Sequence, residues 1–485
     1  MPETNPRALE FVLGERPDET QAGLLVTVVQ KAEEVGCFER LLGGLDLRMK
    51  TSVYTHRNKV ETLVASVAVG CRHIAEIQTK LVPDTAAAAL FDLPRFPDQS
   101  QVNAFLRACG PEQVAHLEEA HATLLDQHSR AGDRRQWLAL PNGQRVLPVD
   151  LDQTDLVTRS TKAEGATRGS FGRKRGQLGY KKSVALLGGH VQEVLYQGLE
   201  AGNVHGQAAV PAILTKLARL LVARGIHPEE VLVRGDSAYG SVDLLRQLQA
   251  AHYHYVLSGY TPATAQHLAE RLPATAVWHL RGTDSNGAQV WSTDAGEQDL
   301  AAHDDRVADP PVRTRVVVVV RVSQRLRKQH GRGAPGAVAE THVSFEHYLT
   351  DYPAAVLSAA AVLDWYGGRE TEESFFRAEQ DAFGAHSLRT KHGDGEAAFL
   401  WILASTVNLL RWVQHTTLSG TVLEQVGLSR LVTQAMRIPA TIERTAAKCR
   451  VIFPSTARLV RQLVNLWDVQ FHQLALPLVF VNDSS

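Results

Sequence analysis

The sequence predicts a mixed α/β protein whose sheet-bearing core is flanked by helical regions and interrupted by a strand-rich insertion. Three observations support this fold class. Apolar residues recur at helical spacing from about residue 10 to residue 135, strand periodicity begins near Gln144, and strands then alternate with helices. At 485 residues the chain exceeds the roughly 250 to 300 residues at which a single hydrophobic core stops growing, so we expect several domains.

Composition places the chain among ordinary globular proteins. Hydrophobic residues make up 44% of the sequence and charged residues 21%, which excludes a largely disordered chain. No stretch reaches the roughly 18 to 20 uncharged apolar residues of a bilayer span, and the first residues lack a signal-peptide pattern. We therefore expect a cytoplasmic protein with no membrane partner. The formal net charge of -1 means that any nucleic-acid contact must come from local basic patches.

The four cysteines lie far apart and show no CxxC spacing, which argues against a zinc knuckle or a disulfide scaffold. Buried free thiols are the expected state of these side chains.

Residues 1–140 are predicted to form a helical, DNA-binding N-terminal domain. Apolar residues at helical spacing fill residues 59–82 and 100–125, with a break at Gly110-Pro111. Asp98 or Ser100 can cap the start of a helix whose first residues are polar, as in a helix that reads DNA. A helix pair that packs only within the protein is the alternative.

Residues 141–259 are expected to form the first part of the α/β core. Pro148 should mark the start of the first strand, because a central strand cannot spare its N–H group. Gly188-Gly189 is suited to the turn of an antiparallel meander. The expected order is strands over 144–156, 182–189 and 191–202, a helix over 207–223, a strand from 231, a helix over 242–250 and a strand over 252–259.

The second half of the chain changes character twice. Residues 260–341 read as a β-strand insertion domain of short strands, with a basic, glycine-rich loop over 325–336. Residues 342–415 return to the core, with a strand, a helix interrupted at Gly367-Gly368, and a strongly apolar helix. Residues 416–485 are expected to form a helical C-terminal domain.

Acidic side chains stand at the ends or mouths of three predicted elements. Asp150 and Asp152 alternate on the first core strand, so both leave the same face, about 7 Å apart, and alternation does not choose between them. Asp236 ends an apolar strand, where ligands of α/β sheets gather. Glu373 lies on a helix, and several residues of polar or aromatic type share its face, namely Tyr366, Arg369, Phe376, Arg377 and Gln380.

Three converging carboxylates would repel one another unless a cation neutralised them. Oxygen ligands of this kind suit Mg²⁺, with Mn²⁺ as a substitute. Two such ions, about 3.5 to 4 Å apart, activate an attacking oxygen and stabilise the leaving oxygen in an in-line displacement. The pattern therefore predicts phosphodiester chemistry. His252 and His254 also alternate on a strand, but no third ligand is nearby.

Three sequence motifs carry a family resemblance: Asp152-Gln-Thr154, Arg234-Gly-Asp236-Ser-Ala-Tyr239 and Tyr366-x2-Arg369-x3-Glu373-x2-Phe376. In this order, with a strand-rich insertion before the third, they resemble the DDE transposases of insertion sequences. The resemblance implies an RNase-H-like core, and it favours Asp152 over Asp150. It further implies that Asp152, Asp236 and Glu373 are catalytic and bind two Mg²⁺ ions per active site.

The resemblance also implies DNA contacts. Tyr366 and Arg369 would contact phosphates of the transposon end, and Trp278 or Trp291 of the insertion would stack on a flipped base. A lysine of the family pattern is replaced by Gln380, so Arg377 is expected to share its role. The run 159–182 holds eight basic residues against one acid and predicts a DNA-backbone patch, with a solvated loop as the alternative. The candidates in that patch are Arg173, Lys174, Arg175, Lys181 and Lys182.

Taken with its resemblance, the chain is expected to be an insertion-sequence transposase and endonuclease. It would cut transposon ends and join each 3′-hydroxyl to target DNA by metal-dependent hydrolysis and transesterification. Its partners would be double-stranded DNA, both terminal inverted repeats and target, and a second copy in a DNA-bound homodimer at the bacterial nucleoid. A transposase-derived DNA-binding protein without cleavage activity and a nuclease with the same core are the alternatives.

Overall fold

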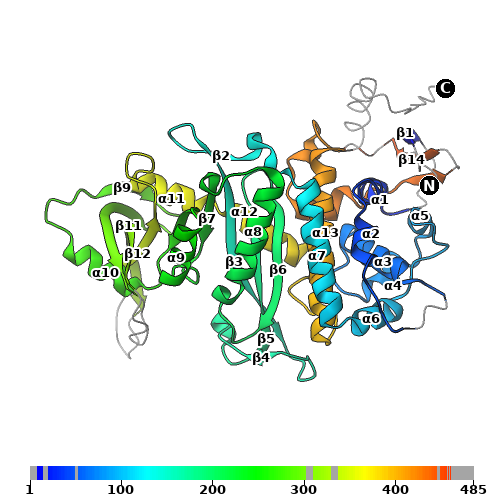
Figure 1. The fold of residues 1–485 in the computed structure, drawn as a ribbon, viewed down its shortest axis with the longest axis horizontal. Helices are drawn as coiled ribbons and strands as arrows, with labels where there is room; N and C mark the ends of the chain where they lie inside the picture. The colour runs from blue at the N-terminus through cyan, green and yellow to red at the C-terminus, as the bar shows by residue number, and fades with distance from the viewer. Residues whose placement is uncertain are drawn as a thin grey trace.

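The computed structural model describes residues 8–14, 20–49, 53–301, 310–328, 337–444 and 448–455, together with 457 and 459. Figure 1 shows an elongated molecule with a large sheet at its centre. Helices from the N-terminal part of the chain occupy one end, and the strands of the insertion occupy the other. The three carboxylates expected to be catalytic lie in the central sheet or directly beside it.

Five strands form the centre of the sheet: β3 (Arg145–Thr158), β5 (Leu178–Leu187), β6 (Glu193–Ala201), β7 (Val231–Gly235) and β8 (His254–Ser258). Their order is β6-β5-β3-β7-β8; β5 is antiparallel to both β3 and β6, whereas β7 runs parallel to β3 and to β8. This is the predicted RNase-H-like arrangement. Short strands β2 (Leu138–Ala139) and β4 (Thr167–Arg168) pair at the margins. Pro148 lies inside β3, three residues after its start, so the predicted strand start was wrong.

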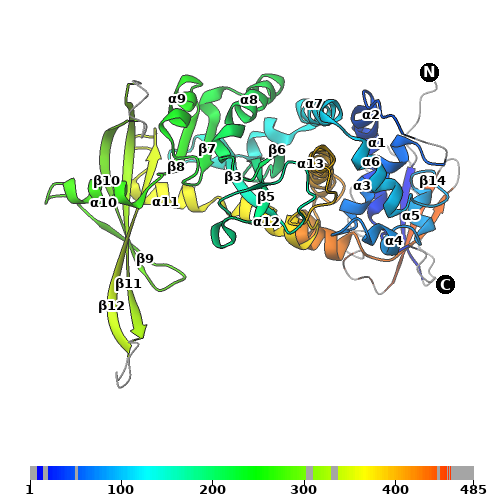
Figure 2. The same cartoon turned by 90° about the horizontal axis from the view of Figure 1, so that it is seen from below.

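Helices cover both faces of this sheet (Figure 2). Helices α8 (Val210–Arg224) and α9 (Val242–Ala250) lie on one face, and α11 (Ala359–Gly367) and α12 (Glu370–Asp381) lie on the other. Ser241 and Ser358 cap the starts of α9 and α11 with their side-chain oxygens. Within the described chain, one segment, Gly206–Arg224, is long and apolar enough to cross a membrane, but here it packs against α7 and β6.

The insertion continues the core sheet. Its strands are β9 (His279–Thr283), β10 (Gln289–Leu300), β11 (Val312–Lys328) and β12 (Ala337–Thr350), and the end of β12 pairs with β8. The expected boundary at residue 341 therefore falls inside a strand. Beyond this contact, β11 and β12 extend from the body as a two-stranded ribbon (Figure 2). Helix α10 (Pro262–Arg271) also lies here, where only strands were expected.

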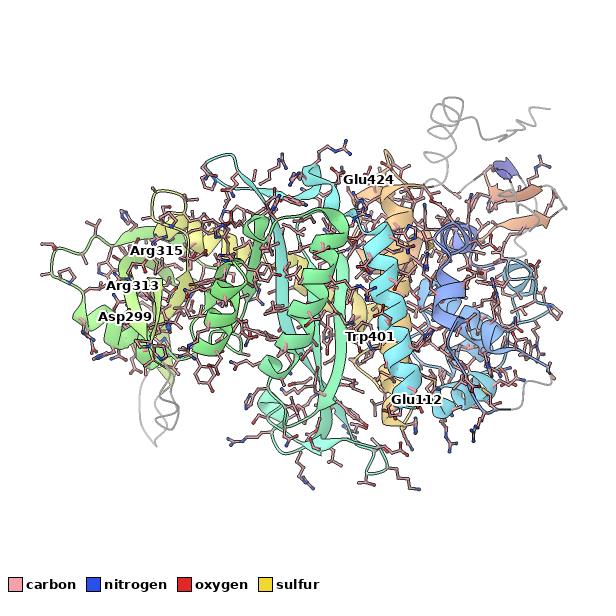
Figure 3. The ribbon with its side chains drawn as sticks, in the orientation of Figure 1. Glu112, Asp299, Arg313, Arg315, Trp401 and Glu424 are labelled. Carbon is pink, nitrogen blue, oxygen red and sulfur yellow. The ribbon has the colours of Figure 1, made fainter. Side chains whose placement is uncertain are left out.

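Helix α13 (Gly393–His415) connects the sheet to the N-terminal helices. Almost all of its side chains are buried, because it packs against β6 on one side and against α1, α3, α6 and α7 on others. Figure 3 labels Trp401 on this helix. The Trp401 ring lies 5.4 Å from the ring of His121 on α7 and 5.6 Å from that of Tyr196 on β6. A helix that is apolar on all sides is suited to this central position.

The N-terminal helices follow the sequence prediction from residue 25 onward. Asp98 caps α6 by accepting hydrogen bonds from the backbone N–H groups of Ser100 and Gln101, as expected. Cys37, Cys71 and Cys109 are buried free thiols, again as expected. The helices are α1 (Leu25–Glu34), α2 (Cys37–Leu42), α3 (His56–Ala68), α4 (Glu76–Lys80), α5 (Thr85–Ala89), α6 (Gln99–Ala108) and α7 (Pro111–His128).

The chain ends depart from the helical prediction. Strand β1 (Ala8–Gly14) pairs in parallel with β14 (Lys448–Pro454), and β13 (Thr441–Arg444) completes a small three-stranded sheet. The expectation of helix across residues 416–485 is therefore wrong for these strands, although α14 (Leu428–Arg430) and a π-helical turn precede them. Residues 460–485 lie outside the described part of the chain.

Candidate functional site

Asp152 and Asp236 lie next to each other at the mouth of the sheet. Strands β3 and β7 pair in parallel register, with Asp150 opposite Arg234 and Leu151 opposite Gly235. Extending this register by one residue places Asp152, which lies within β3, beside Asp236, which directly follows the end of β7. Both side chains are half-buried. An Asp236 carboxylate oxygen accepts the N–H of Ala238 at 2.9 Å, which fixes the turn after β7.

The electrostatics of the pair favour a bound cation. Burial, followed by the negative charge of Asp236, raises the pKa of Asp152 to about 6, although the positive charge of Arg369 opposes this rise. Two half-buried carboxylates within reach of each other gain stability when a divalent ion neutralises them. The residues present therefore fit one part of a Mg²⁺ or Mn²⁺ site.

Asp150 has a different role from Asp152. Its fully buried carboxylate accepts hydrogen bonds from Arg234 Nε at 2.6 Å and Nη2 at 2.8 Å. Arg234 Nη1 also donates to the backbone carbonyl oxygen of Trp365 at 2.9 Å. Because both Asp150 oxygens bind this guanidinium, Asp152 is the carboxylate of the first motif that remains beside Asp236.

The third motif is only partly brought to this pair. Arg369 is buried at the start of α12, where its charge acts on Asp152, and its guanidinium carbon lies 5.0 Å from the centre of the Tyr366 ring. Tyr366 is half-buried at the end of α11, with its ring 4.7 Å from that of Tyr348. Glu373 is exposed one turn after Arg369. Across the described residues, no three His, Cys, Asp or Glu side chains form a group that could hold a metal, so Glu373 does not complete the pair here.

Tyr239, the last residue of the second motif, belongs to the site although the sequence gave it no separate role. It is fully buried, and its hydroxyl has no hydrogen-bond partner among the described residues. Burial, followed by the charges of Asp152 and Asp236, raises its pKa well above the ordinary value. A Cβ atom at Gly235 would lie 2.9 Å from the Tyr239 Cβ, which explains why glycine precedes Asp236.

The predicted basic patch after β3 divides into exposed and buried members. Lys174 and Arg175 are exposed, and the side chain of Arg173 lies outside the described part of the structure. Lys181 is mostly buried and pairs with Asp155 at 2.5 Å. Lys182 is fully buried in an ion pair with Glu379 of α12, so it does not lie on the surface where a DNA contact was expected. This ion pair connects β5 to α12.

The remaining candidate DNA contacts lie on different elements. Arg377 is exposed on α12. Trp278 is half-buried against the main core, and Trp291 is half-buried on β10, where its register neighbours are Leu280 and Val320.

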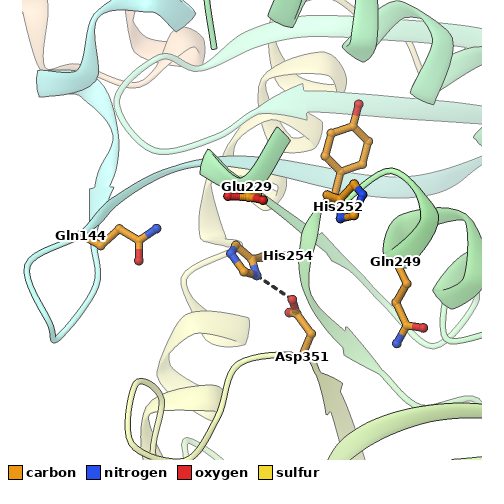
Figure 4. Close-up of a pocket in the computed structure, with 7 residues that line it drawn as sticks. Gln144, Glu229, Gln249, His252, His254 and Asp351 are labelled. Atoms are coloured by element: carbon orange, nitrogen blue, oxygen red, sulfur yellow. Dashed lines mark hydrogen bonds and ion pairs between the residues drawn. The ribbon is translucent and has the colours of Figure 1, made fainter. Parts of the chain in front are cut away.

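A cavity of about 330 Å³ lies at the opposite edge of the sheet from Asp236 (Figure 4). It is formed at the starts of β7 and β8, and His254 Nδ1 lies 2.6 Å from an Asp351 carboxylate oxygen there. The ring of Tyr352 stacks on His254 at 4.3 Å. His254 is thus paired with a carboxylate, and together with His252 it belongs to no three-residue metal group among the described residues.

Comparison with known families agrees with the motifs. The family model for the transposase DDE domain, group 1, matches residues 20–469. Among curated proteins, none matches the chain. The family match covers the helical N-terminal region, both halves of the sheet and the insertion between them. From the extent of this match, the chain belongs to the DDE transposase family.

Proposed function

We propose that this transposase cuts the ends of an insertion sequence and joins each freed 3′-hydroxyl to target DNA by two-metal phosphodiester chemistry. Membership of the family supports a transposase with polynucleotidyl transferase activity. The finer chemistry rests on the residues of the candidate site. Asp152, Asp236 and Glu373 would hold two Mg²⁺ ions, or Mn²⁺ in their place, and these ions would polarise the scissile phosphate.

The observation that carries this proposal is the closeness of Asp152, within β3, to Asp236, directly after β7. Burial, followed by repulsion from Asp236, raises the pKa of Asp152, and a divalent cation would offset both effects. Arg369 lies within electrostatic reach of the same carboxylate and is suited to a phosphate oxygen, because its planar guanidinium donates two hydrogen bonds at once.

Glu373 would complete the site when metal and DNA are bound. It stands one helical turn after Arg369, so it lies on the same side of α12, and its exposed side chain is not held in any ion pair that the structure describes. In this proposal DNA binding brings the carboxylate to the ions that Asp152 and Asp236 already hold.

The DNA contacts and the assembly follow from the same chemistry. Tyr366, Arg369 and Arg377 would contact the strand that carries the scissile phosphate, and Lys174 and Arg175 with Arg173 would contact its backbone. Trp278 or Trp291 would stack on a displaced base. Joining two ends requires two active sites, so we propose a homodimer on double-stranded DNA, at the bacterial nucleoid.

The test is the substitution Asp236→Asn. We expect the variant to bind DNA that carries the element's terminal repeats as wild type does, and to lose nicking of a supercoiled plasmid that contains them in Mg²⁺. Removing one metal ligand should lower the cleavage rate by at least roughly a hundredfold. Asp243→Asn, a neutralisation at an exposed position of α9, is the matched control. Undiminished cleavage by Asp236→Asn would falsify the proposed mechanism.

A transposase-derived DNA-binding protein is the second candidate, favoured by the exposed position of Glu373 and by Gln380 in place of a lysine. DNA binding without nicking in Mg²⁺ or Mn²⁺ would support it. Strand joining, assayed with a pre-cut end, separates the transposase from a nuclease with the same core.

A further inference from the structure

A cleft of about 910 Å³ lies where three separate segments of the chain meet. One wall is the end of α6, another is the loop that follows β3, and the third is the loop between α12 and α13. Figure 1 shows α6, the start of α13 and the β4–β5 region along the same edge of the molecule. The family motifs name no residue of this cleft.

Positive side chains dominate the cleft. Arg107, Arg159, Lys162 and Lys391 line it and are exposed, and none of the four forms an ion pair within the described chain. The acidic residue of the lining, Glu164, lies 3.4 Å from His392 across the cleft wall. Four uncompensated cations on a chain with a net charge of -1 form a local basic patch of the kind that DNA binding requires.

Backbone hydrogen bonds fix the two loops relative to each other. The N–H of Glu164 donates to the carbonyl oxygen of Lys391 at 2.9 Å, and the Tyr180 hydroxyl donates to the carbonyl oxygen of Glu164. The buried Glu396 carboxylate accepts the N–H groups of Arg389 and Thr390 at 2.7 and 3.0 Å. The cations are therefore presented on loops whose backbone positions are already set, which lowers the entropic cost of binding.

The cleft and Asp152 share strand β3. Val157, which lines it, follows Asp152 by five residues on the same strand, a distance of about 17 Å along β3. A DNA strand advances about 3.4 Å per nucleotide, so this distance corresponds to about five nucleotides.

We propose that this cleft binds the phosphate backbone of the DNA duplex, about five base pairs from the phosphate that the active site cleaves. The distance along the duplex rests on the proposed function, whereas the phosphate contact itself does not. Exposed arginine and lysine side chains on separate elements match a backbone that passes several phosphates. A single small anion is instead bound by donors that converge in a buried pocket.

The experiment compares two full-length double variants that each remove two positive charges. Arg107→Ala/Lys391→Ala removes cations of the cleft, and Arg48→Ala/Arg437→Ala removes exposed cations elsewhere. Binding of a fluorescein-labelled duplex of several helical turns is measured by anisotropy in EDTA over a series of salt concentrations. We expect the cleft variant to bind roughly tenfold more weakly near physiological salt and to reduce the salt slope by about 1.8, while the control matches wild type.

Melting temperatures of all variants are measured alongside, and Lys162→Ala replaces the double variant if the latter does not fold. Equal binding by the cleft and control variants, or no binding of duplex by wild type, would overturn the inference. Nicking of supercoiled plasmid in Mg²⁺ is measured separately, where the cleft variant should raise KM and leave kcat unchanged. Absence of nicking by wild type, with weakened binding by the cleft variant, overturns the proposed function and leaves the phosphate contact standing.

Discussion

Arg234 joins the three segments that carry the motifs. It lies two residues before Asp236, its carboxylate partner Asp150 lies two residues before Asp152, and it binds the carbonyl oxygen of Trp365, immediately before Tyr366. One fully buried guanidinium therefore connects β3, β7 and α11 directly behind the candidate site. Its three nitrogens bind both Asp150 carboxylate oxygens and the Trp365 carbonyl oxygen, a spacing that the single nitrogen of a lysine does not reproduce.

We expect Arg234→Lys to destabilise the protein by about 2 to 4 kcal/mol, because the buried Asp150 carboxylate and the Trp365 carbonyl lose donors together. Urea unfolding measures the free energy of unfolding. Nicking of the supercoiled plasmid in Mg²⁺ should also be reduced in this variant. Arg135→Lys, at an exposed ion pair with Asp133, is the control and should leave the stability close to that of wild type. Equal stability of Arg234→Lys and wild type would contradict this role.

Asp152→Asn should stabilise the metal-free protein while it removes activity. The folded-state pKa of Asp152, about 6, exceeds its ordinary value of 3.8, so its charge opposes folding above pH 6 and has no such effect well below pH 4. We expect the free energy of unfolding of the variant to exceed that of wild type by about 1 to 2 kcal/mol at pH 7.5 and to equal it well below pH 4. Urea unfolding at the two pH values measures it. Mn²⁺ should raise the melting temperature of wild type alone; an equal rise in the variant would refute Asp152 as a ligand.

At the level of helices and strands, sequence periodicity predicted those elements whose position depends on the local pattern of apolar residues. Helix α9 matches its expected bounds because apolar residues form one clear stripe, and α13 was evident from its uninterrupted apolar character. Helix α10 was missed because Ala265 is its one buried residue among those described, so it has no apolar stripe. Strands β1 and β14 were missed because each pairs with a partner that is distant in sequence.

For the candidate site as well, the sequence predicted features that depend on local motifs and missed those that depend on contacts between distant residues. Motif spacing predicted Asp152 and Asp236, and β3 and β7 place them together. The exposure of Glu373 depends on how α12 is rotated, which no motif contains. Lys182 looked like a surface cation because the residue that neutralises it, Glu379, lies 197 positions away.

His121 connects three elements and should make stability depend on pH. Its buried ring lies 2.9 Å from the Val194 carbonyl oxygen on β6 and 3.0 Å from Ser405 Oγ on α13. Burial lowers its pKa from 6.5 to about 4, so the unfolded chain binds a proton first and stability is lost as pH falls from 6.5 towards 4.

Between pH 7 and pH 4 the free energy of unfolding should fall by up to about 3 kcal/mol less in His121→Gln than in wild type. Glutamine keeps a hydrogen-bonding group but does not titrate. Urea unfolding at a series of pH values measures the slope. His205→Gln removes an exposed histidine and should leave the slope unchanged. If both variants keep the wild-type dependence of unfolding free energy on pH, His121 is not the group responsible for it.

At the scale of the whole molecule, the continuous sheet determines how the insertion is connected to the candidate site. Backbone pairing of Tyr348, Leu349 and Thr350 with β8 attaches the insertion strands to the same sheet that carries Asp152 and Asp236. Groups on the insertion therefore hold a set distance from the carboxylates. The formal net charge of -1 is consistent with this organisation, since cations are needed only where DNA passes.

The pairing of β1 with β14 has a consequence during synthesis. Ala8 emerges from the ribosome early, but its partner Lys448 is made more than four hundred residues later. Until then β1 has no partner on the β14 side, and an unpaired edge is a template for pairing with another chain. A nascent chain that stalls before Lys448 would keep that edge open. Closure of this small sheet thus requires translation as far as β14, after the central sheet has already been translated.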